Sequence, residues 1–226
     1  MRIVQQDIKL PVTNNDVQNM KNNMRHGVLL PSTIRCLIVG PSSSGKTNVM
    51  LSLIEDLNGL RFKNIYVYSK SLFQPKYQYL KTLLEPIKGI SYFEFYGLED
   101  NIPSPQMAKS NSIFIFDDVA CDKQNIIKEY FTMARHSGID TFYLIQTYSF
   151  VPKHLIRDNA NFLILFKQDN LNLRHVYDDH ISTDFTFDKF KEICSFCWKD
   201  KYGFIVIDKE NEINSGRYRK SFDIFI

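Results

Sequence analysis

The sequence predicts an α/β fold in which helices cover a mostly parallel β-sheet, and three features of the chain support this prediction. A short apolar strand at 33–39 leads into a loop rich in glycine and serine and then into a segment with helical spacing. Two continuous apolar runs, at 113–116 and 162–166, have the composition of strands that are buried on both faces. Helical patterns separate these runs, and strands that alternate with helices are typical of parallel sheets.

The predicted strands and helices divide the chain into three regions. Residues 1–32 are polar and weakly patterned, which predicts an N-terminal arm. Residues 33–168 form the core, and residues 169–226 form a small C-terminal α+β extension packed on it. The other expected elements are strands at 65–68, 90–96, 141–145 and 204–207 and helices at 77–84, 126–134, 152–156, 171–179 and 186–197.

The composition is that of an ordinary globular protein. The 226 residues suffice for one α/β domain with a small appendage, and 44% hydrophobic with 23% charged residues is usual for such a chain. The 28 basic and 25 acidic residues give a net charge of +3, which is too small to indicate nucleic-acid binding by itself. Any surface that binds DNA must therefore be local.

The sequence shows no signal for export or for a membrane. Its four cysteines form no disulfide framework, so we expect a reducing compartment. The polar residues 1–30 lack the apolar core of a signal peptide. No apolar run approaches the roughly 20 residues of a membrane span. We expect a protein that is neither secreted nor associated with a membrane.

Residues 40–47 have the Walker A pattern G-x-x-x-x-G-K-T, which predicts a loop that binds phosphate. Such a loop turns its backbone N–H groups toward a polyphosphate, and side chains would block that approach. Lys46 is then expected to reach the β and γ phosphates, and Thr47 to offer its hydroxyl to Mg²⁺. The plainer alternative is a glycine- and serine-rich turn with a chance lysine. The residues expected to bind nucleotide are Gly40, Pro41, Ser42, Ser43, Ser44, Gly45, Lys46 and Thr47.

The apolar run at 113–116 ends in two acids, Asp117 and Asp118. In enzymes with such a phosphate loop, the strand beside the loop ends in an aspartate that holds the Mg²⁺ water shell, and the next acid polarises the attacking water. We therefore predict that Asp117 binds the metal and that Asp118 is the base. The alternative is a strand that simply ends in a turn, where aspartate is common.

Gln146 follows the predicted strand at 141–145. The carboxyl ends of parallel strands face the ligand crevice, so Gln146 is placed to touch the γ-phosphate or its water. Its alternative role is a polar residue that closes a strand. Asp122 is expected to cap the helix at 126–134. Phe166 precedes Lys167 where a guanine-reading loop would carry Asn or Thr, which favours ATP over GTP.

Two weaker patterns lie in the last sixty residues. The set His175, His180, Cys194 and Cys197 has the residue types of a zinc site, although apolar helix faces would also accept the cysteines as core. The cluster Arg-Tyr-Arg-Lys at 217–220 pairs cations with an aromatic ring, as nucleic-acid binders do, but a solvated basic turn is the commoner explanation.

The motifs at 40–47, 114–118, 134–139 and 146–159 occur in an order that resembles viral DNA-packaging ATPases. The similarity is to the Polinton/Maverick and poxvirus type, within the FtsK/HerA-like superfamily of DNA-pumping motors. This resemblance implies a RecA-like αβα sandwich and a homo-oligomeric ring, a hexamer or pentamer, that hydrolyses ATP at subunit interfaces. It also implies double-stranded DNA and capsid or portal vertex proteins as partners. The expected location is the host cytoplasm or nucleus and, during packaging, the virion.

Ring motors of this kind need a cation from the neighbouring subunit to stabilise charge on the transferred phosphoryl group. The candidates are Arg135, Arg157 and Arg174, and the sequence does not decide among them. Each could instead form a surface salt bridge. The expected function is ATP-driven translocation of double-stranded DNA into a capsid. The alternatives are a helicase or DNA-transfer motor without a capsid, and a nucleotide switch or small-molecule kinase.

Overall fold

The computed structural model describes residues 25–97, 101–122 and 124–226. Most of the predicted N-terminal arm, residues 1–24, therefore lies outside the described residues. Within the described ranges, no helix is long and apolar enough to cross a lipid bilayer.

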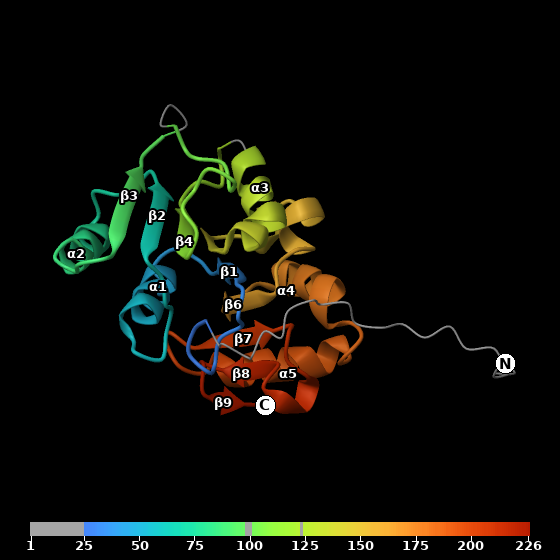
Figure 1. Cartoon of the computed structure of the whole chain (residues 1–226). Coiled ribbons are helices and arrows are strands. Elements are labelled where there is room, and N and C mark those ends of the chain that lie inside the picture. Colours follow the sequence, from blue (N-terminus) through green and yellow to red (C-terminus); the bar gives the residue numbers. More distant parts are fainter. Residues whose placement is uncertain (1–24, 98–100, 123) are drawn as a thin grey trace, which may run out of the picture.

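A single sheet forms the centre of the molecule. Its strands are β1 (Arg35–Val39), β2 (Asn64–Ser69), β3 (Ser91–Phe95), β4 (Ser112–Asp117), β5 (Ile139–Ile145), β6 (Phe162–Phe166), β7 (Phe204–Asp208), β8 (Tyr218–Lys220) and β9 (Ile224–Phe225). Among the described residues the sheet is nine-stranded, in the order β3-β2-β4-β5-β1-β6-β7-β8-β9 (Figure 1). Strands β1 to β6 pair in parallel, and β7 to β9 continue the sheet in antiparallel pairs. The predicted mostly parallel α/β sheet is confirmed.

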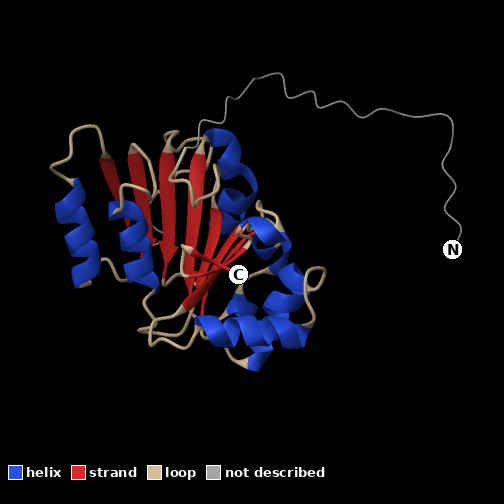
Figure 2. Cartoon of the chain, turned by 90° about the horizontal axis from the view of Figure 1, so that it is seen from below, coloured by secondary structure: helices blue, strands red, loops and turns tan. Residues whose placement is uncertain are grey.

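Helices cover both faces of the sheet, as Figure 2 shows. The helices are α1 (Lys46–Glu55), α2 (Pro75–Leu84), α3 (Asn125–Met133), α4 (Asn170–Val176) and α5 (Phe187–Cys197), with shorter turns η1 (Ala134–Ser137), η2 (Tyr148–Phe150), η3 (Lys153–Arg157), η4 (Tyr177–Ile181) and η5 (Ile213–Ser215). Met50 of α1 and Leu80 of α2 belong to the apolar cluster on one face. Tyr130 of α3, Leu173 of α4 and Phe190 of α5 belong to the cluster on the other. The fold is therefore an αβα sandwich.

Local sequence explains where several helices begin. Pro75 occupies the first position of α2, where its fixed φ suits a helix and its missing N–H costs nothing. The side chain of Asp169 accepts a 2.8 Å hydrogen bond from the Asn172 N–H and caps α4. Thr186 caps α5 in the same way, through the N–H of Lys189.

The strand order differs from the expectation at one important point. The sequence placed the strand that ends in Asp117 directly beside the strand of the phosphate loop, and this is wrong. Strand β5 lies between them, because β1 pairs with β5 and β6, and β4 pairs with β2 and β5. Gln146, which follows β5, therefore comes between the phosphate loop and the two acids.

The basic cluster at 217–220 is neither a solvated turn nor a free cationic arm. It contains strand β8, and its cations are neutralised within the chain. Arg219 is 1% exposed and forms a 2.7 Å ion pair with the equally buried Asp208. Arg217 pairs with Asp184 at 2.8 Å, and Lys220 pairs with an aspartate of the turn before β7, also at 2.8 Å. The prediction of an exposed basic cluster failed because β-pairing buries residues that look exposed in the sequence.

Asp122 does not cap a helix, since α3 begins only at Asn125. Its carboxylate instead accepts a 2.6 Å hydrogen bond from the Tyr68 hydroxyl and pairs with Lys70. These contacts tie the loop after β4 to the end of β2. The predicted cap was therefore wrong, although the helix itself begins within one residue of the predicted position 126.

The four possible zinc ligands do not come together. Cys194 and Cys197 are buried in the core on α5. His180 is buried beside the Tyr148 hydroxyl, 2.8 Å from its Nε2, and burial lowers its pKa to about 3. Among the described residues, no group of three or more His, Cys, Asp and Glu side chains could hold a metal ion. The cysteines are core residues here.

Replacing Arg219 with alanine should lower the free energy of unfolding by about 3 to 5 kcal/mol, because the Asp208 carboxylate would stay buried without its counter-charge. Urea denaturation measures this change. Lys189→Ala, which removes an exposed ion pair with Glu192, is the matched control and should leave the unfolding midpoint unchanged. Equal midpoints for the two variants would contradict the buried pair.

Candidate functional site

The loop between β1 and α1 is shaped by close packing. A Cβ added at Gly40 would lie 2.6 Å from Ser44 Oγ and 2.7 Å from Phe166 Cβ, so no side chain fits there. Gly45 has a φ of 112°, a left-handed conformation that side chains rarely adopt, and it directly precedes α1. Phe166 at the end of β6 therefore fixes how the chain leaves β1. The two glycines of the motif are explained by this geometry.

Lys46 lies across this loop. Its Nζ donates hydrogen bonds to the carbonyl oxygens of Gly40, at 2.7 Å, and Pro41, at 3.0 Å. Burial lowers the pKa of Lys46, while the charges of Asp117 and Asp118 act in the opposite direction. The ammonium group is thus placed between the loop and the two acids.

Two observations show that the loop suits an anion. The hydroxyl of Ser44 is buried, and it has no hydrogen-bond partner among the described residues. Gly45 is the N-cap residue of α1 and has no side chain that could accept a hydrogen bond. The first N–H groups of the helix therefore lack a side-chain partner. Buried polar groups are normally satisfied, and uncapped helix N-termini attract negative charge. A phosphate group would satisfy both.

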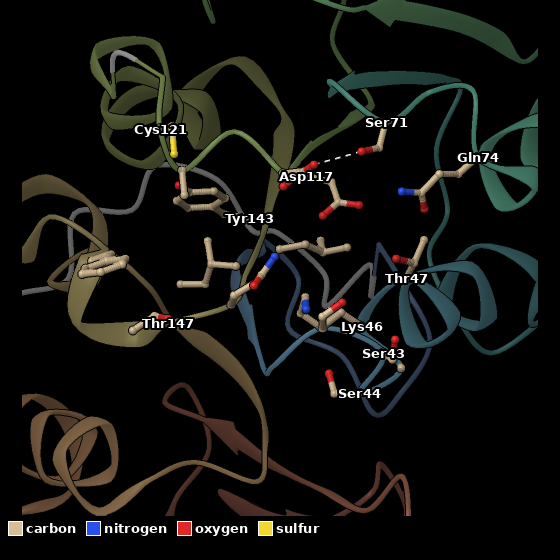
Figure 3. A pocket seen from close by; sticks show the side chains of 18 of the residues that line it. Ser43, Ser44, Lys46, Thr47, Ser71, Gln74, Asp117, Cys121, Tyr143 and Thr147 are labelled. Atoms are coloured by element: carbon tan, nitrogen blue, oxygen red, sulfur yellow. Dashed lines mark hydrogen bonds between the residues drawn. The ribbon is translucent and has the colours of Figure 1, made fainter.

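A cavity of about 580 Å³ opens in front of this loop (Figure 3). Its walls come from the phosphate loop, the segments after β4 and β5, and the connection between β2 and α2. The predicted site residues that line it are Ser42, Ser43, Ser44, Gly45, Lys46, Thr47, Asp117, Asp118 and Gln146. Gly40 and Pro41 do not line it, and their carbonyl oxygens accept the hydrogen bonds of Lys46.

The two acids have different surroundings. Asp117 is half-buried, and the Tyr77 hydroxyl donates a hydrogen bond to its Oδ2. Burial raises the pKa of Asp117, whereas this hydrogen bond and the charge of Lys46 oppose the rise. Asp118 is exposed, has a φ of 57°, and accepts a 2.9 Å hydrogen bond from Ser71 Oγ. Aspartate tolerates this left-handed conformation better than most residues.

Thr47 and Asp117 face the same cavity and present oxygen atoms only. Hydroxyl and carboxylate oxygens are the ligands that a hard cation such as Mg²⁺ prefers. The residues present therefore fit the predicted Mg²⁺ site.

Sequence reasoning missed the connection between β2 and α2. Ser71, Gln74 and Lys76 line the cavity from this side, and Tyr77 bonds to Asp117. The rule that found Gln146, polar residues at the carboxyl end of a parallel strand, applies equally to the end of β2. It could have identified Ser71.

None of the three candidate arginines lines the cavity in the described part of the chain. Arg157 is buried and pairs with Asp179 at 2.5 Å, which argues against a role in a neighbouring subunit. Arg174 is exposed on α4 and pairs with Asp178 at 3.2 Å. Arg135 is exposed in η1. Because η1 precedes β5, it lies at the amino-terminal end of the parallel strands, and the cavity lies at their carboxyl end.

Comparisons with known proteins agree with this architecture. No family model matches the chain, and no curated protein sequence matches it. The genome packaging NTPase B204 from Sulfolobus turreted icosahedral virus 2, in complex with sulfate, is 15% identical with a TM-score of 0.54 over 79% of this chain and 92% of that chain. The same protein with AMP is 13% identical with a TM-score of 0.52, covering 80% and 95%. B204 from Sulfolobus Turreted Icosahedral Virus, described as a DNA-packaging ATPase, has a TM-score of 0.50 at 15% identity, over 77% and 92%.

At this identity the similarity shows the fold. It confirms the predicted P-loop NTPase architecture.

A Gly40→Ala variant should bind ATP at least about tenfold more weakly, because the new methyl group would displace Ser44 or Phe166 and open the loop. Titration with a fluorescent ATP analogue measures this affinity. Gly97→Ala is the matched control, since a Cβ there meets nothing within 4 Å. If both variants bind as tightly as the wild type, the packing explanation of Gly40 is wrong.

Proposed function

We propose that this chain is an ATPase that moves double-stranded DNA and packages a viral or virus-like genome into a capsid. The observation that carries the proposal is the cavity at which Lys46, Asp117, Asp118 and Gln146 converge. The order of the motifs along the chain and the shared fold of a viral genome packaging NTPase support it.

In this proposal the phosphate loop holds the triphosphate of ATP. The Ser44 hydroxyl and the first N–H groups of α1 bind phosphate oxygens, and Lys46 exchanges its two carbonyl partners for the β and γ phosphates. Thr47 and Asp117 would hold Mg²⁺, which when bound neutralises charge on these phosphates. The loop thereby fixes the direction in which the γ-phosphate points, toward Asp118.

Asp118 acts as the general base on water. The water oxygen forms a bond to the γ-phosphorus, its proton passes to Asp118, and the bond to the bridging oxygen of ADP breaks. Gln146 lies between the loop and the acids, where it orients this water or contacts the γ-phosphate. The products are ADP and inorganic phosphate.

The positive charge for the transition state comes from a neighbouring subunit in this proposal. Lys46 supplies one cation within the chain, but all three candidate arginines lie outside their own cavity. A ring of six or five copies would bring Arg135 or Arg174 to the cavity of the next subunit, and both are exposed. Hydrolysis would then require assembly around DNA at a capsid or portal vertex, in the host cytoplasm or nucleus.

Long duplex DNA should stimulate ATP turnover by the wild-type chain, and the stimulation should be independent of sequence and fall with salt, because phosphate contacts release counterions.

Lys46→Ala should abolish turnover. Asp118→Asn should still bind ATP but turn it over about 10²-fold more slowly. Steady-state release of phosphate, with and without DNA, measures turnover by the wild type and both variants, and titration with a fluorescent ATP analogue measures binding by Asp118→Asn. Specific activity should also rise with protein concentration as rings form.

Asp188→Asn, a change on the exposed face of α5, is the control and should match the wild type. Turnover that ignores DNA and delivers phosphate to a small acceptor would identify a kinase instead. Slow, DNA-independent hydrolysis would identify a nucleotide switch. ATP-dependent unwinding of forked duplexes would favour a helicase.

A further inference from the structure

The segment 68–77, which we call the β2–α2 segment, runs along Asp117 at the end of β4 and the acids that follow it. Strands β2 and β4 are parallel neighbours, and Ser69 lies opposite Asp117 in their register. Because both strands end at this level, the residues after β2 lie beside the residues after β4. The β2–α2 segment thus forms one wall of the cavity.

The last residue of β4 and the two aspartates of the loop after it each receive a partner from this segment. The Tyr77 hydroxyl donates to Asp117 Oδ2, and Ser71 Oγ donates to Asp118 Oδ2 at 2.9 Å. The dashed line in Figure 3 marks the contact of Ser71. The third carboxylate, Asp122, is held by Tyr68 and by a lysine of the same segment. All three of these carboxylates are therefore held by one neighbouring segment.

The Tyr77 side chain is fixed by packing of its ring and by polar contacts of its hydroxyl. Tyr77 is 2% exposed, and its ring packs in the apolar cluster with Ile115 of β4 and Leu80 of α2. Ser69 interacts with the same hydroxyl and accepts a 3.0 Å hydrogen bond from the Ser71 N–H.

We propose that Tyr77 and Ser71 are positioning residues: Tyr77 sets the orientation of the Asp117 carboxylate for Mg²⁺, and Ser71 holds Asp118 for its reaction with water. This inference rests on the proposed function. A hydrogen bond to one carboxylate oxygen fixes rotation about the Cβ–Cγ bond, and such outer partners orient metal-binding carboxylates. The roles are separable because each residue touches a different acid.

Tyr77→Phe tests the first role, since it removes the hydroxyl and keeps the ring in the core. The Mg²⁺ concentration that gives half-maximal binding of a fluorescent ATP analogue should rise about 10- to 100-fold. Binding of the same analogue in EDTA should stay within about twofold of the wild type, because the phosphate loop is unchanged. This readout does not depend on turnover.

Tyr130→Phe is the matched control. Tyr130 is equally buried on a helix, in the apolar cluster on the other face of the sheet, and its hydroxyl donates a 2.9 Å hydrogen bond to the Pro103 carbonyl instead of an acid. Its Mg²⁺ requirement should match the wild type.

Ser71→Ala tests the second role and should lower kcat about tenfold or more at unchanged KM and unchanged Mg²⁺ requirement.

The outcomes separate this inference from the proposed function. If the wild type shows Mg²⁺-dependent binding and turnover but Tyr77→Phe behaves like Tyr130→Phe, the positioning role of Tyr77 is refuted and the function stands. If Ser71→Ala keeps the wild-type kcat, the role of Ser71 is refuted. If the wild type binds nucleotide equally well with Mg²⁺ and with EDTA, the Mg²⁺ site of the proposed function fails, and with it the role of Tyr77.

Discussion

The parallel pairing of β1, β5, β4 and β2 is the constraint on which the site depends. Val39 of β1 lies opposite Ile145 of β5. The neighbouring Leu144 lies opposite Asp117 of β4, which in turn lies opposite Ser69 of β2. The four strands therefore end at nearly the same level. Because of this, the phosphate loop, the glutamine, the two acids and the β2–α2 segment meet around one cavity although the chain keeps them far apart.

Buried charged residues lie at the opposite, amino-terminal end of the parallel strands. Asp140 at the start of β5 is fully buried and accepts a 2.8 Å hydrogen bond from the Ile34 N–H. His26 Nε2 lies 2.9 Å and Arg25 Nη2 lies 3.2 Å from its other oxygen. These contacts fasten the end of the N-terminal arm to the sheet. Arg135 lies at this same end of the strands, so it can act in hydrolysis only by reaching the cavity of another copy.

The sequence predicted those parts of the site whose signals are local. The motif at 40–47, the acids after a buried apolar run, and Gln146 after another were all recognisable from short patterns. Strand order was not, because it depends on which apolar runs pair across long distances. For the same reason nothing set Tyr77 apart from the rest of the expected helix at 77–84, and Arg219 looked like part of an exposed basic turn although it pairs with a buried carboxylate.

The claim that hydrolysis at this cavity drives movement along DNA is tested most directly by displacement of a triplex-forming oligonucleotide from a long duplex. We expect the wild-type chain to displace the third strand when ATP is present and the flanking duplex is long, without separating the two strands of the duplex. We expect no displacement by Lys46→Ala or without ATP. Normal ATP turnover on such DNA with no displacement would contradict the account.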